Sequence, residues 1–388
     1  MKIGIAAPIE VASLKNHLPN LNKEDLNLGL GGTAINILID GFINAGHHVT
    51  VFTLDRTLKS DYILEGPNLK IYFGKFRTSL KYKIFDFCKI EYKQIQRFIE
   101  IEKHNIDIVN AHWSYEFAIG TLLSGLPHLI TFRDHSQSIL KLTKHPYRLT
   151  RLLMDLWVRK KGSNFSFNST YLASLVGIDG TVIANPIRTA EITKAKKHPG
   201  KIHRMKICYI ANGWDHRKNP ENAIEAFKLL MENNNVNAEL HLIGKGFEPY
   251  GQNYIRNQEN GCPKNIIFRG PMTHVALMEE LKSFDIMLHT AREESFGNNL
   301  IEAMAKGIPV IAGRDAGAVP WVLDYGKAGY LVDIENPLQI AKGLKDLITD
   351  TSLYEKFSLQ GINNLLTRFS QEEVCNAYVH EFSKIINN

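Results

Sequence analysis

Two glutamates, Glu294 and Glu302, flank the start of an expected helix. Glu294 lies in a loop after an apolar run, Gly297 permits a tight turn, and helical periodicity begins within residues 298–304. The first N–H groups of a helix have no partner inside it, so they can bind a phosphate, while the two carboxylates can accept hydrogen bonds from hydroxyl groups. For an isolated glutamate, an acidic first turn that only complements the helix dipole is the simpler interpretation. The loop as a whole predicts a sugar-nucleotide site.

The elements that position this site are those of an α/β protein. Short β-branched runs alternate with helical stretches, which is typical of parallel sheets covered by helices. We therefore predict two doubly wound, Rossmann-like domains that face each other across a cleft, with ligands at the carboxyl ends of the strands. The predicted domains are residues 1–190 and 191–368, joined by a polar linker within residues 185–204. Residues 369–388 are predicted to form a helix that crosses back to the first domain.

Composition and charge exclude several classes of protein. Of the 388 residues, 44% are hydrophobic and 22% are charged, as in an ordinary soluble globular protein. The four scattered cysteines fit neither a disulfide framework nor a zinc site. The first residues are predicted to form a strand rather than a signal peptide, and no apolar run approaches the ~20 residues that span a bilayer. We expect a cytoplasmic protein that is at most bound to the inner face of the cytoplasmic membrane.

Two further segments have the composition of phosphate-binding loops. The glycine-rich segment Gly29–Thr33 precedes a helical run after the first strand, so its bare backbone can approach a phosphate closely. It is not the Gly-x-Gly-x-x-Gly dinucleotide fingerprint, and a plain turn is the alternative. Lys218 follows the first strand of the second domain and can place a cation on a diphosphate. Taken alone, a solvated lysine is the simpler interpretation.

Taken together, five ordered segments resemble the retaining glycosyltransferases of the GT-B fold, family 4, also called glycosyl transferases group 1. The match extends over nearly the whole chain and is densest in residues 207–333. The five segments are Gly29–Thr33, Asn110–Trp113, Val182–Pro186, Ile207–Lys218 and the loop from Glu294 through Pro320. The resemblance implies that the first domain binds the acceptor and that the second binds a nucleotide-diphosphate sugar, a UDP- or GDP-sugar.

The resemblance also implies a role for each motif residue. His112 is the implied catalytic residue that contacts the donor sugar, although a lone histidine at a strand end is often a core residue. Glu294 is implied to accept hydrogen bonds from sugar hydroxyls. The implied donor-binding residues are Gly31, Gly32 and Thr33 (distal phosphate and sugar), Arg217 and Lys218 (diphosphate), Gly270 and Met272 (nucleobase), Asn298, Asn299 and Leu300 (backbone N–H to phosphates), and Glu302 (ribose).

The chain departs from the family pattern at three places. Asn212 and the preceding alanine replace a Gly-Arg pair, Trp321 replaces a glutamate, and Arg133–His135 replaces a His-Asp or His-Thr pair. No Asp-x-Asp pair is present to hold a divalent cation on the diphosphate. We therefore predict no cofactor and no metal. Helix N-termini, glycine amides and Lys218 neutralise the leaving group instead.

The acceptor is predicted from the first domain. Residues 1–200 hold 26 Lys and Arg against 17 Asp and Glu, whereas the remainder holds 20 against 23. The segments Lys75–Ile90 and Lys141–Lys161 interleave cations with apolar residues, and such segments can lie on an anionic bilayer. Amphipathic helices that simply pack on the domain are the alternative. On a membrane, the acceptor is a glycan or lipid-linked saccharide of a bacterial surface polysaccharide or lipopolysaccharide.

Two other functions compete with a retaining hexosyltransferase. One is a non-catalytic sugar-nucleotide or glycan-binding partner of another transferase, which the departures at Asn212 and Trp321 keep open. The other is a UDP-sugar epimerase or a phosphorylase on the same fold, for which no acid–base carboxylates or cofactor lysine are recognisable. Nucleic-acid binding is not predicted, because the glycine loop and the carboxylate pair would then have no purpose.

Overall fold

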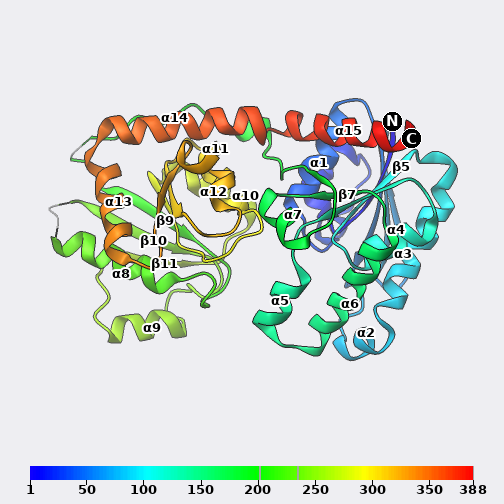
Figure 1. The fold of residues 1–388 in the computed structure, drawn as a ribbon, viewed down its shortest axis with the longest axis horizontal. Helices are drawn as coiled ribbons and strands as arrows, with labels where there is room; N and C mark the ends of the chain where they lie inside the picture. Colours follow the sequence, from blue (N-terminus) through cyan, green and yellow to red (C-terminus); the bar gives the residue numbers. More distant parts are fainter. Residues whose placement is uncertain (201, 234–235, 388) are drawn as a thin grey trace. The chain divides into compact units, whose positions relative to one another are not determined.

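The computed structural model describes residues 1–388 except 201, 234–235 and 388. The chain forms two compact units: Met1–Pro186 together with Gln371–Asn388, and Ile187–Ser370 (Figure 1). The chain thus passes into the second unit after residue 186, where the sequence predicted residue 190. It returns at residue 371, where the sequence predicted residue 369. Each unit is a mostly or wholly parallel sheet with helical connections, which confirms the predicted α/β class with two Rossmann-like domains.

The first unit contains an eight-stranded sheet in the order β3-β4-β2-β1-β5-β6-β7-β8. All neighbours are parallel except the edge pair β3 and β4, which is antiparallel. The strands are β1 (Lys2–Ala6), β2 (His48–Asp55), β3 (Tyr62–Glu65), β4 (Leu69–Lys75), β5 (Ile108–His112), β6 (His128–Phe132), β7 (Phe165–Phe167) and β8 (Thr181–Val182).

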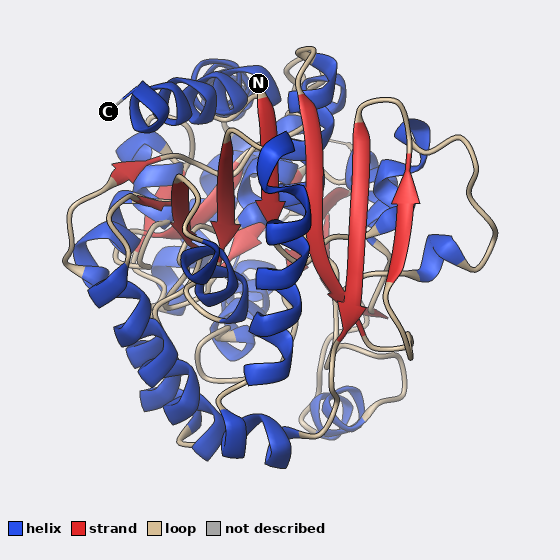
Figure 2. Ribbon diagram, turned by 90° about the vertical axis from the view of Figure 1, so that its right-hand side faces the viewer, coloured by secondary structure: helices blue, strands red, loops and turns tan. Residues whose placement is uncertain are grey.

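Helices surround the sheet of the first unit (Figure 2). A buried apolar core that includes Phe52, Phe98 and Phe132 lies where helices pack on the strands. The α-helices are α1 (Thr33–Asn44), α2 (Leu80–Asp86), α3 (Lys89–Glu102), α4 (Glu116–Ser124), α5 (Ser136–Thr143), α6 (Pro146–Lys161), α7 (Thr170–Val176) and α15 (Gln371–Asn387).

Helix α15, the last of the chain, is part of the first unit. Its apolar stripe of Val374, Tyr378 and Phe382 is buried. The rings of Tyr378 and Phe382 lie 6.3 and 5.9 Å from that of Phe42 in α1. Gln371 fixes the start of the helix by donating from Nε2 to the carbonyl of Ile37 at 2.7 Å. A period-3.6 apolar stripe therefore ties the end of the chain to its first helix.

The second unit contains a six-stranded parallel sheet in the order β11-β10-β9-β12-β13-β14. The order reverses at β9, so the carboxyl ends of β9 and β12 flank the point where such folds bind ligands. The strands are β9 (Met205–Ile210), β10 (Ala238–Ile243), β11 (Ile266–Gly270), β12 (Ile286–His289), β13 (Val310–Gly313) and β14 (Tyr330–Val332). The α-helices are α8 (Pro220–Asn233), α9 (Gln252–Glu259), α10 (His274–Glu280), α11 (Asn298–Ala305), α12 (Val319–Val322), α13 (Pro337–Thr349) and α14 (Thr351–Arg368).

Two strands of the first unit differ from the sequence prediction. The local pattern of residues 106–110 predicts a strand there, but the strand begins at Ile108, where pairing with Ile3 of β1 starts, and His112 is its last residue. Strand β3 was not predicted, because its four residues show little apolar alternation and Ile63 is 48% exposed. Pairing with β4, and not local periodicity, makes β3 a strand.

Candidate active site

An ion pair joins the two loops at the switch point of the second unit. Lys218 lies in the loop after β9 and Glu294 in the loop after β12, and these strands are neighbours in the sheet. Lys218 Nζ is 2.5 Å from Glu294 Oε1. Arg217 Nη1 lies 3.7 Å, and His289 Nε2 3.8 Å, from the same oxygen. One buried carboxylate oxygen thus gathers three nitrogen-bearing side chains where a diphosphate is predicted to bind.

Hydrogen bonds hold these two loops together independently of the ion pair. The hydroxyl of buried Tyr209 donates to the carbonyl of Lys218 at 2.7 Å. Thr290 Oγ1 donates to the carbonyl of Asn219 at 2.7 Å, and the amide of Arg292 donates to the carbonyl of Arg217 at 2.8 Å. The backbone that carries both partners of the pair is therefore fixed before any ligand arrives.

Glu294 is a permanently ionised acceptor in this setting. Burial raises the pKa of its carboxyl group, but His289 and the Lys218 ammonium outweigh burial and hold that pKa at about 2. A carboxylate with such a pKa accepts hydrogen bonds at neutral pH and does not donate a proton. His289 was missed by the sequence analysis, although its place as the last residue of β12 was a usable signal.

Helix α11 begins as the sequence predicted, with one difference in its first turn. Gly297 caps the helix at φ +88°, a left-handed conformation, and a Cβ there would lie 3.0 Å from the Leu300 side chain. Asn299 donates from Nδ2 to the carbonyl of Ile210, the last residue of β9, at 2.9 Å. The Leu300 amide was predicted to face a phosphate. Instead it donates to the Gly297 carbonyl at 3.0 Å, because the tight turn that starts the helix uses it.

Glu302 is separate from the Lys218–Glu294 pair. Its Oε1 lies 3.0 Å from Nε2 of His274, the first residue of α10, and its side chain is 10% exposed. The hydrogen bond to Glu302 is the main cause that raises the pKa of His274. The segment from Gly270 to Met272 immediately precedes α10. The structure thus brings the predicted ribose carboxylate and the predicted base segment together through His274, which the sequence analysis did not single out.

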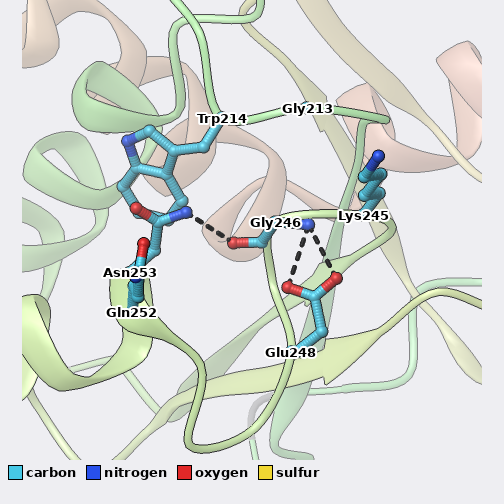
Figure 3. A pocket seen from close by; sticks show the side chains of 7 residues that line it. All are labelled: Gly213, Trp214, Lys245, Gly246, Glu248, Gln252 and Asn253. Atoms are coloured by element: carbon cyan, nitrogen blue, oxygen red, sulfur yellow. Dashed lines mark hydrogen bonds between the residues drawn. The ribbon is translucent and has the colours of Figure 1, made fainter.

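A cavity of about 380 Å³ opens at the carboxyl ends of β9 and β10 (Figure 3). Both carboxylate oxygens of Glu248 accept from the Gly246 amide at 3.0 Å, and Asn253 donates to the Gly246 carbonyl at 2.9 Å. A Cβ on Gly270 would lie 3.5 Å from Glu248, so the cavity adjoins the predicted base segment. The lining residues are Gly213, Trp214, Lys245, Gly246, Glu248, Gln252 and Asn253.

In the first unit, the glycine loop packs tightly on the end of β1. Gly32 has φ +121°, and a Cβ there would lie 2.3 Å from the carbonyl oxygen of Pro8. A Cβ on Gly31 would meet no atom within 4 Å, so Gly31 faces open space, unlike Gly29 and Gly32 in the same loop. Helix α1 begins at Thr33. The loop therefore presents bare backbone around Gly31 ahead of a helix N-terminus, as a phosphate-binding loop requires.

His112 is fully buried and is held by Arg133. Arg133 donates from Nε at 3.1 Å and from Nη2 at 3.0 Å to His112 Nδ1, and from Nη1 to Asn185 Oδ1. Burial, with the Arg133 charge, lowers the pKa of His112 well below its usual value. The imidazole is therefore neutral, and because Nδ1 accepts, its proton resides on Nε2. Nε2 is buried without a hydrogen-bond partner among the described residues.

Comparison with known proteins shows the family. The family model described as "Glycosyl transferases group 1" matches residues 191–364, nearly all of the second unit. This unit belongs to the glycosyl transferases group 1 family. The chain is accordingly a glycosyltransferase, and the Lys218–Glu294 pair lies in its family-defining region.

Similarity to other glycosyltransferases extends beyond this region. The chain is 25% identical over 348 residues to N-acetyl-alpha-D-glucosaminyl L-malate synthase of Bacillus anthracis, covering 86% of this chain and 88% of that protein. Its fold resembles sucrose-phosphate synthase from Thermosynechococcus elongatus, with a TM-score of 0.72, 16% identity and 99% of each chain covered. It also resembles Anabaena HepE in complex with UDP and glucose, with a TM-score of 0.66, 16% identity, and 99% and 100% covered.

Two of the departures of this glycosyltransferase from the family pattern have structural explanations. The Trp321 ring packs edge-on against Phe296 and Phe369, with the Arg368 guanidinium 4.7 Å from its centroid. It is thus part of an aromatic cluster within the second unit. Asn212 Oδ1 accepts from the amide of Lys245 at 3.3 Å and supports the loop after β10. Neither position supplies a charge, so Arg217 and Lys218 are the cations at the carboxyl end of β9.

Across the described residues, no group of three or more His, Cys, Asp or Glu side chains is placed to hold a metal ion. Within the same part of the chain, no helix combines the length and the apolar character needed to cross a bilayer.

Proposed function

We propose that this glycosyltransferase is a retaining, metal-independent hexosyltransferase that uses a UDP- or GDP-sugar. The observation that carries the proposal is the cluster of Lys218, Arg217 and His289 around the Glu294 carboxylate at the switch point of a Rossmann-like sheet. Two cations beside a helix N-terminus can neutralise a diphosphate without a metal ion. A carboxylate of pKa about 2 can accept hydrogen bonds from the hydroxyls of the transferred sugar.

Donor binding must rearrange this cluster. In the ligand-free pair the Lys218 ammonium is engaged by Glu294. A diphosphate carries more negative charge than one carboxylate, so it draws Lys218 and Arg217 towards its oxygens. Glu294 then has lone pairs free for sugar hydroxyls. The pair therefore keeps both partners ionised and oriented until the donor separates them.

The transfer step needs no protein nucleophile. The acceptor hydroxyl attacks the anomeric carbon from the face that the diphosphate leaves, so the new C–O bond replaces the broken one with retained configuration. A leaving-phosphate oxygen takes the acceptor proton, which balances the reaction. His112 is proposed to donate its Nε2 hydrogen to a donor-sugar hydroxyl. Because the imidazole is neutral and its pKa is lowered, it acts as a hydrogen-bond donor and not as an acid.

The nucleoside is proposed to bind beside Gly270 and Met272, with Glu302 on the ribose. The adjoining cavity supports this placement. It lies one strand away from the Lys218–Glu294 pair, and Trp214 lines it. The Trp214 indole already packs on Phe247 at 5.2 Å and donates to Glu221 at 2.6 Å. A rigid aromatic wall of this kind suits a flat base.

The acceptor is proposed to be a saccharide or a lipid-linked saccharide presented at an anionic membrane surface. Helix α2 and helix α6, from the two predicted segments, pack against each other in the first unit. Helix α6 buries Met154 and Val158, yet it leaves Leu149 and Leu153 almost half exposed. Phe85 in α2 is 87% exposed. Lys81 of α2 and Lys160 and Lys161 of α6 are exposed, whereas Lys83 of α2 is buried. Exposed apolar side chains beside exposed lysines support a peripheral location on the inner face of the membrane.

Donor use is tested with a panel of UDP-, GDP- and ADP-sugars in the presence of EDTA. We expect one donor to raise the melting temperature and to release its nucleoside diphosphate slowly. The Glu294→Gln variant should still bind the nucleotide-sugar but should no longer release the nucleoside diphosphate. A protein that binds a nucleotide-sugar and releases no diphosphate would instead be a binding partner of another transferase, and conversion of the sugar without release would indicate an epimerase.

Membrane binding is tested separately by vesicle flotation. We expect the protein to float with vesicles containing phosphatidylglycerol and not with phosphatidylcholine alone. Phe85→Ser should weaken flotation, whereas Tyr250→Ser, at an 81% exposed position of the second unit, should not. Equal flotation of both variants would remove α2 from the proposed surface.

A further inference from the structure

Arg133 of the first unit is a buried cation without an anionic partner. It follows the carboxyl end of β6 and is 8% exposed. None of the ion pairs among the described residues includes it, and its hydrogen bonds go to the neutral groups of His112 and Asn185. Burying a charge without a counter-charge costs several kcal/mol, so such groups are normally paired. The fold therefore maintains a cation here at a cost to its own stability.

Three acidic side chains of the first unit, one of them next to Arg133 in the sequence, have other partners. Asp134 accepts from the Tyr115 hydroxyl at 2.8 Å. Glu116 pairs with Arg151, and Asp155 with Arg159 at 2.5 Å. These three carboxylates thus contact Tyr115, Arg151 and Arg159 and not Arg133. The Tyr378 ring of α15, which stacks edge-on with His112 at 6.3 Å, carries no charge at neutral pH.

The Arg133 guanidinium keeps hydrogen-bond donors that no neighbour uses. A guanidinium has five N–H groups, and the hydrogen bonds to His112 and Asn185 use three of them. Two N–H groups therefore remain. The single N–H of His112 is assigned to the donor sugar, so Arg133 alone supplies these donors; the buried Tyr378 hydroxyl beside them has no partner and can donate or accept. Two spare N–H groups on a positively charged guanidinium are complementary to an oxyanion and not to a cation or a neutral amine.

These donors lie where the first sheet is expected to bind ligands. His112 ends β5, Arg133 follows β6 and Asn185 lies just beyond β8, so all three are at the carboxyl edge of parallel strands. We propose that Arg133 is the centre of an oxyanion site that binds a carboxylate or phosphate group of the acceptor. This inference rests on the proposed transferase function, and it adds that the acceptor is an anion.

The test uses the full chain and two simple oxyanions, sodium succinate and inorganic phosphate. Melting temperatures are measured over a concentration series at constant ionic strength, with chloride as the matched salt. We expect a saturable rise in the wild-type protein and an apparent Kd at least tenfold weaker in Arg133→Gln. Arg97→Gln removes the same charge from a 52% exposed side chain of the same unit and should match the wild type. Arg133→Lys, which keeps the charge and loses the fork, should give an intermediate Kd.

Three results would overturn the inference. One is an unchanged Kd in both Arg133 variants, and another is a wild-type protein whose melting temperature follows ionic strength alone. The third is competition between UDP and succinate, which would assign Arg133 to the donor phosphates. UDP affinity is measured in parallel and should stay within twofold in Arg133→Gln. UDP binding without an oxyanion response refutes only this inference, whereas an oxyanion response without donor use refutes only the proposed function.

Discussion

Replacing each partner of the Lys218–Glu294 pair should change UDP affinity in opposite directions. Lys218→Met removes a cation from the predicted diphosphate site, so UDP should bind more weakly. Glu294→Gln removes a buried negative charge from the same site and frees Lys218, so UDP should bind more tightly. The isosteric amide keeps the shape of the loop. The same Glu294→Gln variant should lose sugar transfer, because a neutral amide accepts hydrogen bonds from hydroxyls less strongly.

The size of both effects follows from Coulomb's law. Unit charges about 6 Å apart interact by about 3 kcal/mol at an effective dielectric constant of about 20, before salt screening. The Glu294 side chain is 14% exposed, so screening by solvent is incomplete. We therefore expect about 1–2 kcal/mol in each direction, or roughly 5- to 30-fold in Kd. Breaking the pair also leaves one buried charge unpaired, so both variants should lose some thermal stability.

Isothermal titration calorimetry with UDP and with uridine measures the change directly. Uridine lacks the diphosphate, so its affinity should be the same in both variants. Lys197→Met is the control, because it removes a lysine that is 85% exposed and pairs with Glu355 of the same unit. If Lys218→Met and Glu294→Gln both weakened UDP binding equally, the pair would be a structural clamp. The electrostatic reasoning would then be refuted.

Two further predictions concern stability. The pKa of His274 is raised by Glu302, so the charged pair stabilises the fold fully below pH 6.5, and this contribution is lost as pH rises through the higher folded-state pKa. His274→Gln should flatten the decline of melting temperature above pH 6.5, and an unaltered profile would exclude the pair as its cause. Gly32→Ala should destabilise the protein strongly. Backbone strain alone costs about 1–3 kcal/mol, and the new Cβ would in addition lie 2.3 Å from the carbonyl oxygen of Pro8. Gly31→Ala, at φ +89° in open space, should cost only about 1 kcal/mol, and equal melting temperatures would contradict the contact.

A further prediction concerns metal independence. If Lys218 and Arg217 neutralise the diphosphate, EDTA should leave the rate of donor hydrolysis unchanged, and added Mg²⁺ should not restore the rate of Lys218→Met. Recovery by Mg²⁺ would show that a metal ion can replace the cation, and dependence on Mg²⁺ in the wild-type protein would contradict the proposal.

The sequence by itself determined the architecture, and it predicted where the proposed donor site lies. Alternation of β-branched runs with helical periodicity predicted two Rossmann-like domains, and the family match and the two sheets confirm them. Gly297 and the residues after it predicted the start of α11, because a left-handed cap and helical periodicity are local properties. Placing Lys218 and Glu294 after strands was enough to put both at a carboxyl edge.

Only the tertiary structure decided which side chains meet. Lys218 and Glu294 pair because β9 and β12 are neighbours although 76 residues separate the two side chains, and strand order is not written in local periodicity. His274 contacts Glu302 through the same kind of non-local pairing. Burial keeps the His112 imidazole neutral, and the fold places no carboxylate beside Arg133. The tight turn that starts α11 engages the Leu300 amide. Local pattern fixes elements, whereas pairing, protonation and the unpaired charge depend on what the folded chain places around each group.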